Sequence, residues 1–488
     1  MVDIKDQKIP IQNGATPSKH IEIMIPGKKI LDNNLLDMLG NQPSLHKLYT
    51  QISSIYAVTD PEVHGHIINT LRNGLERLAE SFPWLAGYVI NEGASEGVTG
   101  TYRIVPTDKI PLVVKNLRDD ASAPTMDAMR QAGFPFRTLD ENAIAPCTTI
   151  NIPGIPIGLV DDHGPVFAVQ ANFMKGGLVL TIVGQHNTMD MVGQNNIIDW
   201  LSRACHGDAF SQEELAVGNM DKSQSVQLLD ASWQPGAEIE HQLSKPPVEG
   251  SDESTKSQGT RPRLSWGYVN FPPTSLKALK SEAMATKPAD SDFVSTDDAI
   301  CAFIWTCLSR ARANRLQIDT NTTFARAIDV RSRLGLPATY PGALTNMTYN
   351  RSSIGAVGGQ SLGSVASDLR KQLNPSVTDL AYNTRALATF LSRCADKSQV
   401  LVTGCVDPSS GIMLSSWAGV SLYDLDFNLG LGRPEAVRRP RFFPVESLMY
   451  IMPKSPRGDM AVAMCIRDED WQRLKEDEEW GKFVEFIG

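Results

Sequence analysis

A histidine and an aspartate stand four positions apart in residues 184–193, GQHNTMDMVG. A neutral imidazole accepts a proton near pH 7, so His186 is a candidate general base, with Asp190 as a candidate to support it. In a chain with eight histidines, the same spacing also arises by chance. The alternative is a histidine at a strand end, followed by an aspartate that caps a helix. The spacing alone leaves both interpretations open.

The sequence on either side of this pair predicts a strand and then a helix. Residues 167–174 and 177–185 are two apolar runs separated by a short glycine-containing turn, which predicts an antiparallel hairpin. From Asp190 to residue 205 the apolar side chains recur at helical spacing. His186 is therefore expected at the end of a strand, where α/β folds present functional side chains.

Similar patterns occur along the whole chain and predict an α/β protein. The C-terminal segment reads as one amphipathic helix that buries Trp471, Leu474, Trp480, Phe483 and Phe486. The predicted strands are 20–26, 82–90, 264–271, 445–453 and 460–467, and the predicted helices are 61–82, 295–316, 361–373 and 469–487.

A chain of 488 residues exceeds the usual size of one hydrophobic core, so two large domains are expected. Residues 1–19 are polar and are predicted to form a flexible N-terminal extension. The N-terminal domain is placed at 20–215 and the C-terminal domain at 264–488. Residues 216–263 are predicted to be a crossover linker, because their second half is rich in proline, serine, glycine and charge.

The composition excludes several classes of function. A net charge of −9 argues against a general nucleic-acid binder. No apolar run is long enough to span a membrane, and the N-terminus lacks the apolar segment of a signal peptide. Seven scattered cysteines without a C-x-x-C pair indicate reduced thiols, a cytoplasmic protein and no zinc site. The absence of heptads or repeats favours a monomer.

Residues 359–363, GQSLG, match the G-x-S-x-G motif of hydrolases. That motif needs an apolar strand before its serine. The preceding residues are IGAVGG and the following ones begin a helix, so Ser361 is predicted to be a helix N-cap and not a nucleophile.

A third stretch lies far downstream, at residues 413–442. Its glycine-rich loop contains Asp426, and the loop either turns sharply for structural reasons or lets backbone approach a ligand. Four arginines follow, and they form either a solvated surface or a site for phosphates: Arg433, Arg438, Arg439 and Arg441.

The H-x-x-x-D motif together with DFNLGLGRP (426–434) resembles the two signatures of the BAHD acyltransferases. Further segments resemble that family in the same order along the chain: 75–87, 295–305, 327–346 and 415–419. Others resemble its fungal trichothecene-acetylating members, notably DENAIAP, FMKGGLVLT and RRPRFFPVESLMY. Met191 and Asn428 stand where the wider family has glycine, and the second loop is shifted by two residues.

The resemblance implies a fold like that of chloramphenicol acetyltransferase, in which two similar mixed-sheet domains enclose the active site in a tunnel. It implies transfer of an acetyl group from acetyl-CoA to a secondary hydroxyl of a fungal metabolite, the 3-hydroxyl of a trichothecene, as self-protection against the toxin. His186 would be the general base, without an acyl-enzyme. Asp190 would pair with Arg331, and Asp426 would pair with a basic residue to hold its loop.

Two further roles follow from the resemblance. The oxyanion needs a donor, for which Ser416 and Trp417 are the candidates. The phosphates of CoA need cations, for which Arg438, Arg439 and Lys454 are candidates. No metal is expected. The alternatives are another fungal O- or N-acyltransferase with a different acceptor, a non-catalytic metabolite-binding protein, and a hydrolase.

Overall fold

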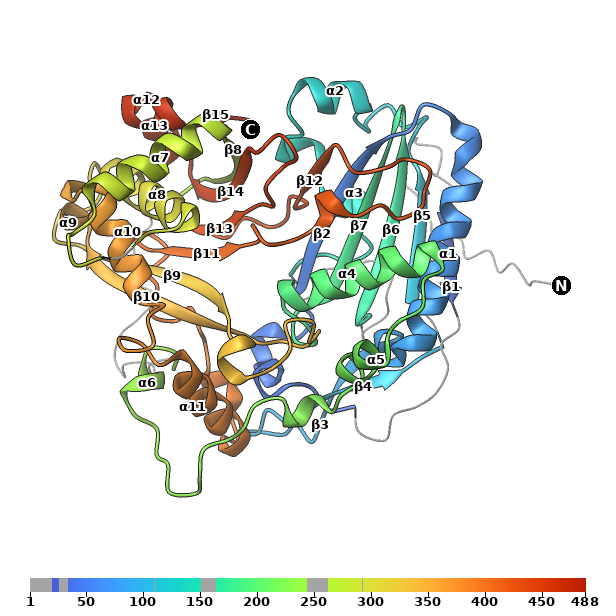
Figure 1. Cartoon of the computed structure of the whole chain (residues 1–488), viewed down its shortest axis with the longest axis horizontal. Helices are drawn as coiled ribbons and strands as arrows, with labels where there is room; N and C mark the ends of the chain where they lie inside the picture. The colour runs from blue at the N-terminus through green and yellow to red at the C-terminus, as the bar shows by residue number, and fades with distance from the viewer. Residues whose placement is uncertain (1–19, 26–33, 109, 151–163, 244–261, 292) are drawn as a thin grey trace.

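The computed structural model describes residues 20–25, 34–108, 110–150, 164–243, 262–291 and 293–488 (Figure 1). Two mixed β-sheets lie side by side, each with helices packed against it. The predicted extension, residues 1–19, lies outside the described residues. The expected α/β fold with two mixed-sheet domains is confirmed.

The first sheet has the order β1-β5-β6-β7-β2-β12. Its predicted hairpin is confirmed, and β6 and β7 are buried along their whole length, which explains their continuous apolar runs. The strands are β1 (His20–Ile25), β2 (Tyr49–Ala57), β5 (Ile110–Asn116), β6 (Phe167–Met174), β7 (Gly177–Gln185) and β12 (Ala436–Arg438).

The second sheet has the order β10-β9-β11-β13-β14-β8-β15, and a separate two-stranded sheet pairs β3 (Gly87–Glu92) with β4 (Thr101–Pro106). The strands of the second sheet are β8 (Leu264–Phe271), β9 (Asn321–Asp329), β10 (Thr345–Ser353), β11 (Ile412–Ser416), β13 (Leu448–Ile451), β14 (Met460–Arg467) and β15 (Glu485–Phe486).

The helices carry the apolar faces that close the two cores. In the first domain α1 packs on α4, with Ile67, Leu71, Leu75 and Leu78 buried at helical spacing. The α-helices are α1 (His64–Ser81), α2 (Met126–Gln131), α3 (Glu141–Ile144), α4 (Met191–His206), α5 (Gln212–Gly218), α6 (Ala237–Glu240), α7 (Pro273–Thr286), α8 (Thr296–Arg312), α9 (Ile354–Gly359), α10 (Leu362–Lys371), α11 (Leu380–Arg393), α12 (Asp468–Glu476) and α13 (Glu478–Phe483).

Two helix starts in the second domain follow their sequence signals. Ser295 and Asp298 form a capping box at the start of α8, inside the predicted helix 295–316. Ser361 caps α10, because its hydroxyl accepts from the Ser364 N–H at 3.3 Å. The G-x-S-x-G match is therefore a helix start, as predicted.

The two sheets are interlocked, which the predicted domain boundaries do not capture. The segment β12 belongs to the C-terminal half of the sequence, yet it pairs with β2 at the edge of the first sheet. Val437 stands opposite Ser54 in that pairing. A C-terminal segment thus reaches across to the first sheet, and the domains placed at 20–215 and 264–488 share that sheet.

The first half of the predicted linker 216–263 is packed structure. Residues up to 243 include α6, and Val226 and Ile239 are buried against α11. The few apolar residues of this stretch therefore form core contacts, a role that its polar composition hid. The remainder, residues 244–261, lies outside the described residues.

The C-terminal segment was predicted as one helix and is divided. The Asp477 carboxylate accepts from the Trp480 N–H and begins α13 after α12 has ended. Trp471, Leu474 and Trp480 are buried as predicted, whereas Phe486 lies in β15 with about half of its surface exposed, 49%. Strand pairing with β8 overrides the helical pattern there.

Candidate active site

The loop between β7 and α4 carries the H-x-x-x-D motif, and hydrogen bonds fix its path. The His186 N–H donates to the Leu48 carbonyl at 2.7 Å. Both the N–H and the hydroxyl of Thr188 donate to the Gln185 carbonyl, at 2.9 and 2.7 Å. The histidine is thus held at the end of a buried strand, as predicted from the sequence.

His186 is surrounded by protein and still keeps accessible surface. Its Nδ1 is buried without a hydrogen-bond partner among the described residues. Burial lowers the pKa of the ring below 6.5, and backbone carbonyls and the Asp190 carboxylate only partly oppose this. A neutral imidazole that keeps accessible surface can accept a proton.

Asp190 is fully buried and points its carboxylate away from His186, into a set of donors. It caps α4 by accepting from the Gly193 N–H at 2.8 Å. It also accepts from the Leu344 N–H at 2.7 Å and the Thr345 hydroxyl at 3.1 Å. Burial raises the pKa of this carboxyl, but Arg331 and these bonds outweigh it, so the pKa lies below its ordinary value.

Arg331 comes from the second domain and holds Asp190 in a bidentate ion pair at 2.8 and 3.0 Å. The remaining donors of the guanidinium bond Asp329 and the carbonyls of Tyr340 and Gly342. Each of its five side-chain N–H groups therefore has an acceptor. The pair fastens the histidine loop to the second domain and has no bond to the imidazole.

Two glycines allow this contact between the domains. A Cβ on Gly193 would lie 2.2 Å from the Pro341 carbonyl oxygen, and one on Gly342 would lie 2.2 Å from the Asp37 carboxylate. Asp37 accepts in turn from the Tyr340 hydroxyl at 2.5 Å and the Ala343 N–H at 3.0 Å. No local pattern marked Asp37, because its partners are about 300 residues away in sequence.

The two residues predicted to donate to the oxyanion are already engaged in this structure. The Ser416 hydroxyl, at the end of β11, donates to Asp297 at 2.5 Å. The Trp417 indole N–H donates to the Ser415 hydroxyl at 3.1 Å. Either would have to break an existing bond to stabilise a developing oxyanion.

The three predicted CoA cations lie in different places. Lys454 is exposed in the turn between β13 and β14. Arg438 is buried and donates to the carbonyls of Gly133, Phe134 and Val437, so its role is to hold the segment after α2. Arg439 is also buried, with 2% of its surface exposed, and it acts on His186 electrostatically.

The second motif is a surface loop that was predicted to be held by an ion pair. Asp426 is exposed, and its carboxylate accepts from the Asn428 N–H at 2.9 Å. Its backbone carbonyl accepts from the Ser202 hydroxyl and contacts the His206 ring. Among the residues that the structure describes, no basic side chain forms an ion pair with the Asp426 carboxylate, so the predicted pairing stays a prediction. Asn428 has a φ of +56°, a left-handed conformation that asparagine tolerates, which explains its presence at a glycine position.

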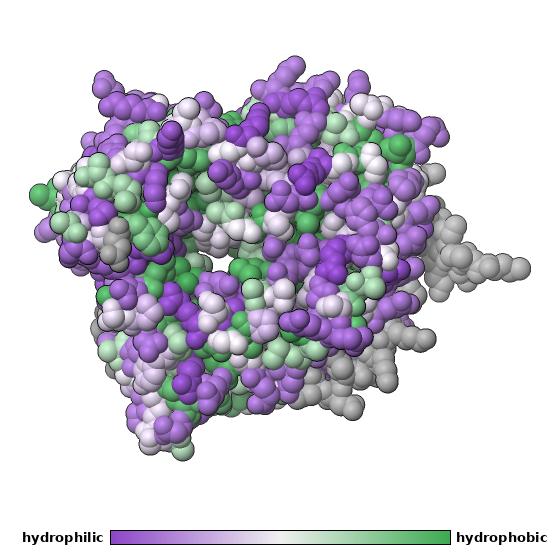
Figure 2. Space-filling view, in the orientation of Figure 1, coloured by the Kyte–Doolittle hydropathy of each residue, from purple (hydrophilic) through white to green (hydrophobic). Residues whose placement is uncertain are grey.

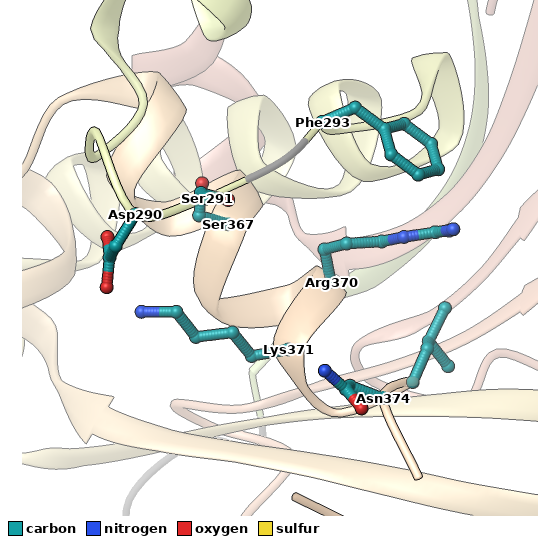
Figure 3. Close-up of a pocket in the computed structure, with 8 residues that line it drawn as sticks. Asp290, Ser291, Phe293, Ser367, Arg370, Lys371 and Asn374 are labelled. Carbon is teal, nitrogen blue, oxygen red and sulfur yellow. The ribbon is translucent and has the colours of Figure 1, made fainter. Parts of the chain in front are cut away.

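The molecular surface is hollowed between the two domains, with hydrophobic residues at the edge of the hollow (Figure 2). A separate pocket of about 290 Å³ lies on the second domain, where Arg370 and Lys371 of α10 face the loop that carries Phe293 (Figure 3). It contains none of the predicted site residues and is distinct from the loop of His186.

Neither a membrane span nor a metal site is found in the part of the chain that the structure describes. None of its helices is long and apolar enough to cross a membrane. No group of three or more His, Cys, Asp or Glu side chains is placed to hold a metal ion.

The sequence matches two family models. Residues 155–480, more than half of the chain, match the Transferase family. Residues 48–205 match the trichothecene 3-O-acetyltransferase-like N-terminal domain. The two matches together include the histidine loop, Arg331 and the Asp426 loop.

Several curated proteins are similar over nearly the whole chain. A trichothecene 3-O-acetyltransferase of Saccharomyces cerevisiae is 56% identical over 94% of this chain and 97% of its own. Trichothecene 3-O-acetyltransferase TRI101 of Fusarium sporotrichioides is 48% identical over 93% and 97%. The O-acetyltransferase dmxR13 of Cryptosporiopsis is 46% identical over 93% and 97%.

Solved structures agree with these similarities. Fusarium graminearum TRI101 complexed with coenzyme A and T-2 mycotoxin superimposes with a TM-score of 0.88, at 47% identity, covering 94% of this chain and 100% of that one. Vinorine synthase superimposes with a TM-score of 0.64 at 16% identity, which supports the fold alone.

Proposed function

The chain belongs to the Transferase family of BAHD-type acyltransferases, and on that premise we propose that it transfers the acetyl group of acetyl-CoA to the 3-hydroxyl of a trichothecene. The observation that carries this proposal is the accessible, neutral His186 at the end of a buried strand, in a chain 56% identical to a trichothecene 3-O-acetyltransferase. Relatives solved with coenzyme A and a trichothecene support both substrates.

In the proposed reaction the Nε2 of His186 removes the proton of the acceptor hydroxyl as its oxygen attacks the thioester carbonyl carbon. The resulting tetrahedral intermediate collapses, the C–S bond breaks, and the CoA thiolate takes the proton from the imidazolium. General base catalysis of this kind is typically worth about 10²–10⁴ in rate. The acetyl group passes directly between the substrates, so no nucleophilic side chain is needed.

Asp190 and Arg331 have a positioning role in this proposal. Their bonds fix the start of α4 against residues 340–345 of the second domain, which sets where His186 lies relative to a substrate between the domains. Lys454, exposed on the second domain, remains a candidate for a CoA phosphate.

A different acceptor is the second candidate, because relatives 31–46% identical are O-acetyltransferases and an O-acyltransferase whose names specify no trichothecene. The test is to incubate the purified protein with acetyl-CoA and a panel of alcohols, and to follow both free thiol and acetylated product by mass spectrometry. We expect thiol release that depends on the alcohol, with a trichothecene bearing a free 3-hydroxyl preferred. Thiol release without any alcohol would identify a hydrolase and contradict the proposal.

A further inference from the structure

Arg439 is a buried cation with unused hydrogen-bond donors. It follows directly after β12, and 2% of its surface is exposed. Its Nη2 reaches the Thr149 hydroxyl only at 3.5 Å, and its Nε and Nη1 have no partner among the described residues. Leaving donors of a charged group unpaired in the interior costs stability, so such a group calls for an explanation.

Aromatic rings surround this guanidinium. Its central carbon lies 4.1 Å from the ring centre of Phe442, 4.7 Å from that of Tyr450 and 5.7 Å from that of Trp417. No carboxylate of the described residues lies within 4 Å to form an ion pair, although Arg439 and the buried Glu141 interact at longer range. Ring faces stabilise the charge but accept no strong hydrogen bond, so the N–H groups remain available.

The neighbouring Arg438 provides the contrast. It is buried to a similar degree, at 8% exposed, and it stacks over Tyr268. Its donors, however, are bonded to three backbone carbonyls. These two arginines are adjacent at the end of the same strand. The donors of Arg438 have protein acceptors, whereas the Nε and Nη1 of Arg439 have none among the described residues.

Arg439 lies where the two sheets meet. Its backbone N–H and carbonyl bond the Tyr268 hydroxyl of β8, in the second sheet, at 2.7 and 3.1 Å, while β12 pairs with the first sheet. Its charge also acts on His186. A guanidinium with unpaired donors therefore lies near enough to the imidazole for its charge to lower the pKa of that ring.

We propose that the Arg439 guanidinium binds an oxygen of a substrate inside the reaction site, an inference that rests on the proposed acetyl transfer. Two oxygens have the required chemistry. One is the thioester carbonyl oxygen, which becomes an oxyanion, and the other is an acceptor oxygen apart from the attacking hydroxyl. The CoA phosphates are excluded, because they lie at the opposite end of the pantetheine arm from the thioester.

The test compares Arg439→Met with Arg438→Met as the matched control. Because a hydrogen bond to a charged group is worth about 1.5–3 kcal/mol, Arg439→Met should lower kcat/KM by roughly 10- to 150-fold. Its melting temperature should hold or rise, since the substitution orphans no partner. Arg438→Met should have a lower melting temperature, because three backbone carbonyls lose their donor, and its kcat/KM should be unchanged. Arg439→Lys should recover part of the lost activity.

The kinetic constants separate the two oxygens. A fall in kcat with an unchanged KM for the acceptor assigns the bond to the thioester oxygen, and a rise in that KM assigns it to the acceptor. An unchanged kcat/KM in Arg439→Met overturns the proposal. So does a loss of kcat/KM in Arg439→Met that is accompanied by a lower melting temperature and is matched by an equal loss in Arg438→Met.

Two further readouts keep this test independent of the acceptor assignment. Removing the Arg439 charge should raise the pKa of His186, because the other charged group that acts on this ring, Asp190, remains. The acid limb of the rate profile should therefore move to higher pH, which a merely structural arginine would not cause. If wild type turns over no alcohol, calorimetry of acetyl-CoA and trichothecene binding decides: weaker binding by Arg439→Met supports the proposal, and equal binding contradicts it.

Discussion

Two buried polar regions lie beside the same short loop, and they differ in how their hydrogen bonds are used. Around Asp190 and Arg331, every carboxylate oxygen and guanidinium N–H has a partner. Around His186 and Arg439, buried nitrogens have none among the described residues. Polar groups whose hydrogen bonds are all made within the protein form a rigid contact between domains. Polar groups that lack a partner can form a hydrogen bond with a substrate. The difference separates positioning from chemistry within one site.

The largest expected effect comes from breaking the satisfied region. Asp190→Ala removes the bidentate, fully buried partner of Arg331 and leaves only the half-exposed Asp329, and breaking a buried pair from one side typically costs about 3–5 kcal/mol. Unfolding in urea, followed by tryptophan fluorescence, should show a much lower midpoint than wild type. Asp426→Ala is the control, since that carboxylate is exposed and its hydrogen bond, from the Asn428 N–H, is local. Equal midpoints for Asp190→Ala and wild type would remove the proposed positioning role.

A smaller effect is expected from Gly193→Ala at the same contact. The added methyl would lie 2.2 Å from the Pro341 carbonyl oxygen, and overpacking of this kind costs about 1–3 kcal/mol. Gly65→Ala in α1 is the matched control, because nothing lies within 4 Å of its Cβ position. Alanine there should leave the urea midpoint unchanged or raise it. If both variants behave alike, the close approach at Gly193 is not a constraint on stability.

Much of this architecture could be predicted from local pattern. The hairpin of β6 and β7, the strand β8 and the cap at Ser361 follow from side-chain periodicity and helix-start signals. The motif pair and the other family segments predicted the acyltransferase assignment. These features all depend on residues that are close in sequence.

The remainder depends on contacts between distant residues, which local patterns do not encode. The position of β12 in the first sheet, the packing of residues 216–243 and the division of the C-terminal helix were all missed for that reason. Arg331 was assigned to Asp190 by resemblance alone. The sequence also offered no means to distinguish Arg438 from Arg439, because only the fold shows which of them has its donors in use.

Ser361, at the G-x-S-x-G match, is expected to contribute to stability and not to catalysis, in contrast to His186. Ser361→Ala removes the N-cap of α10 and should cost about 1 kcal/mol of stability. The rate of acetyl transfer should not change, since the hydroxyl donates to the Thr286 carbonyl and has no part in the proposed chemistry. Stability is measured by urea unfolding and the rate of acetyl transfer by thiol release, on the same preparation. Loss of activity at wild-type stability would revive the nucleophile interpretation.

The smallest expected effect is in the pH dependence. Burial lowers the pKa of His186 below 6.5, so the neutral base persists and kcat should hold as the pH falls through 6.5, declining only at lower pH. The unfolded chain takes up a proton near 6.5 that the folded ring resists, so stability should fall as the pH drops below that value. His186→Gln should lessen this loss of stability. An acid limb in kcat above pH 6.5 would contradict the assignment of His186 as a desolvated base.

The central claim is that the unsatisfied region performs the chemistry, and single-turnover acetyl transfer by His186→Ala tests it most directly. Wild type and variant are mixed with acetyl-CoA and a trichothecene that bears a free 3-hydroxyl, and their urea midpoints are compared. We predict a rate lower by about 10²–10⁴ at a retained midpoint. A variant that transfers the acetyl group as fast as wild type would show that His186 is only a residue in a turn.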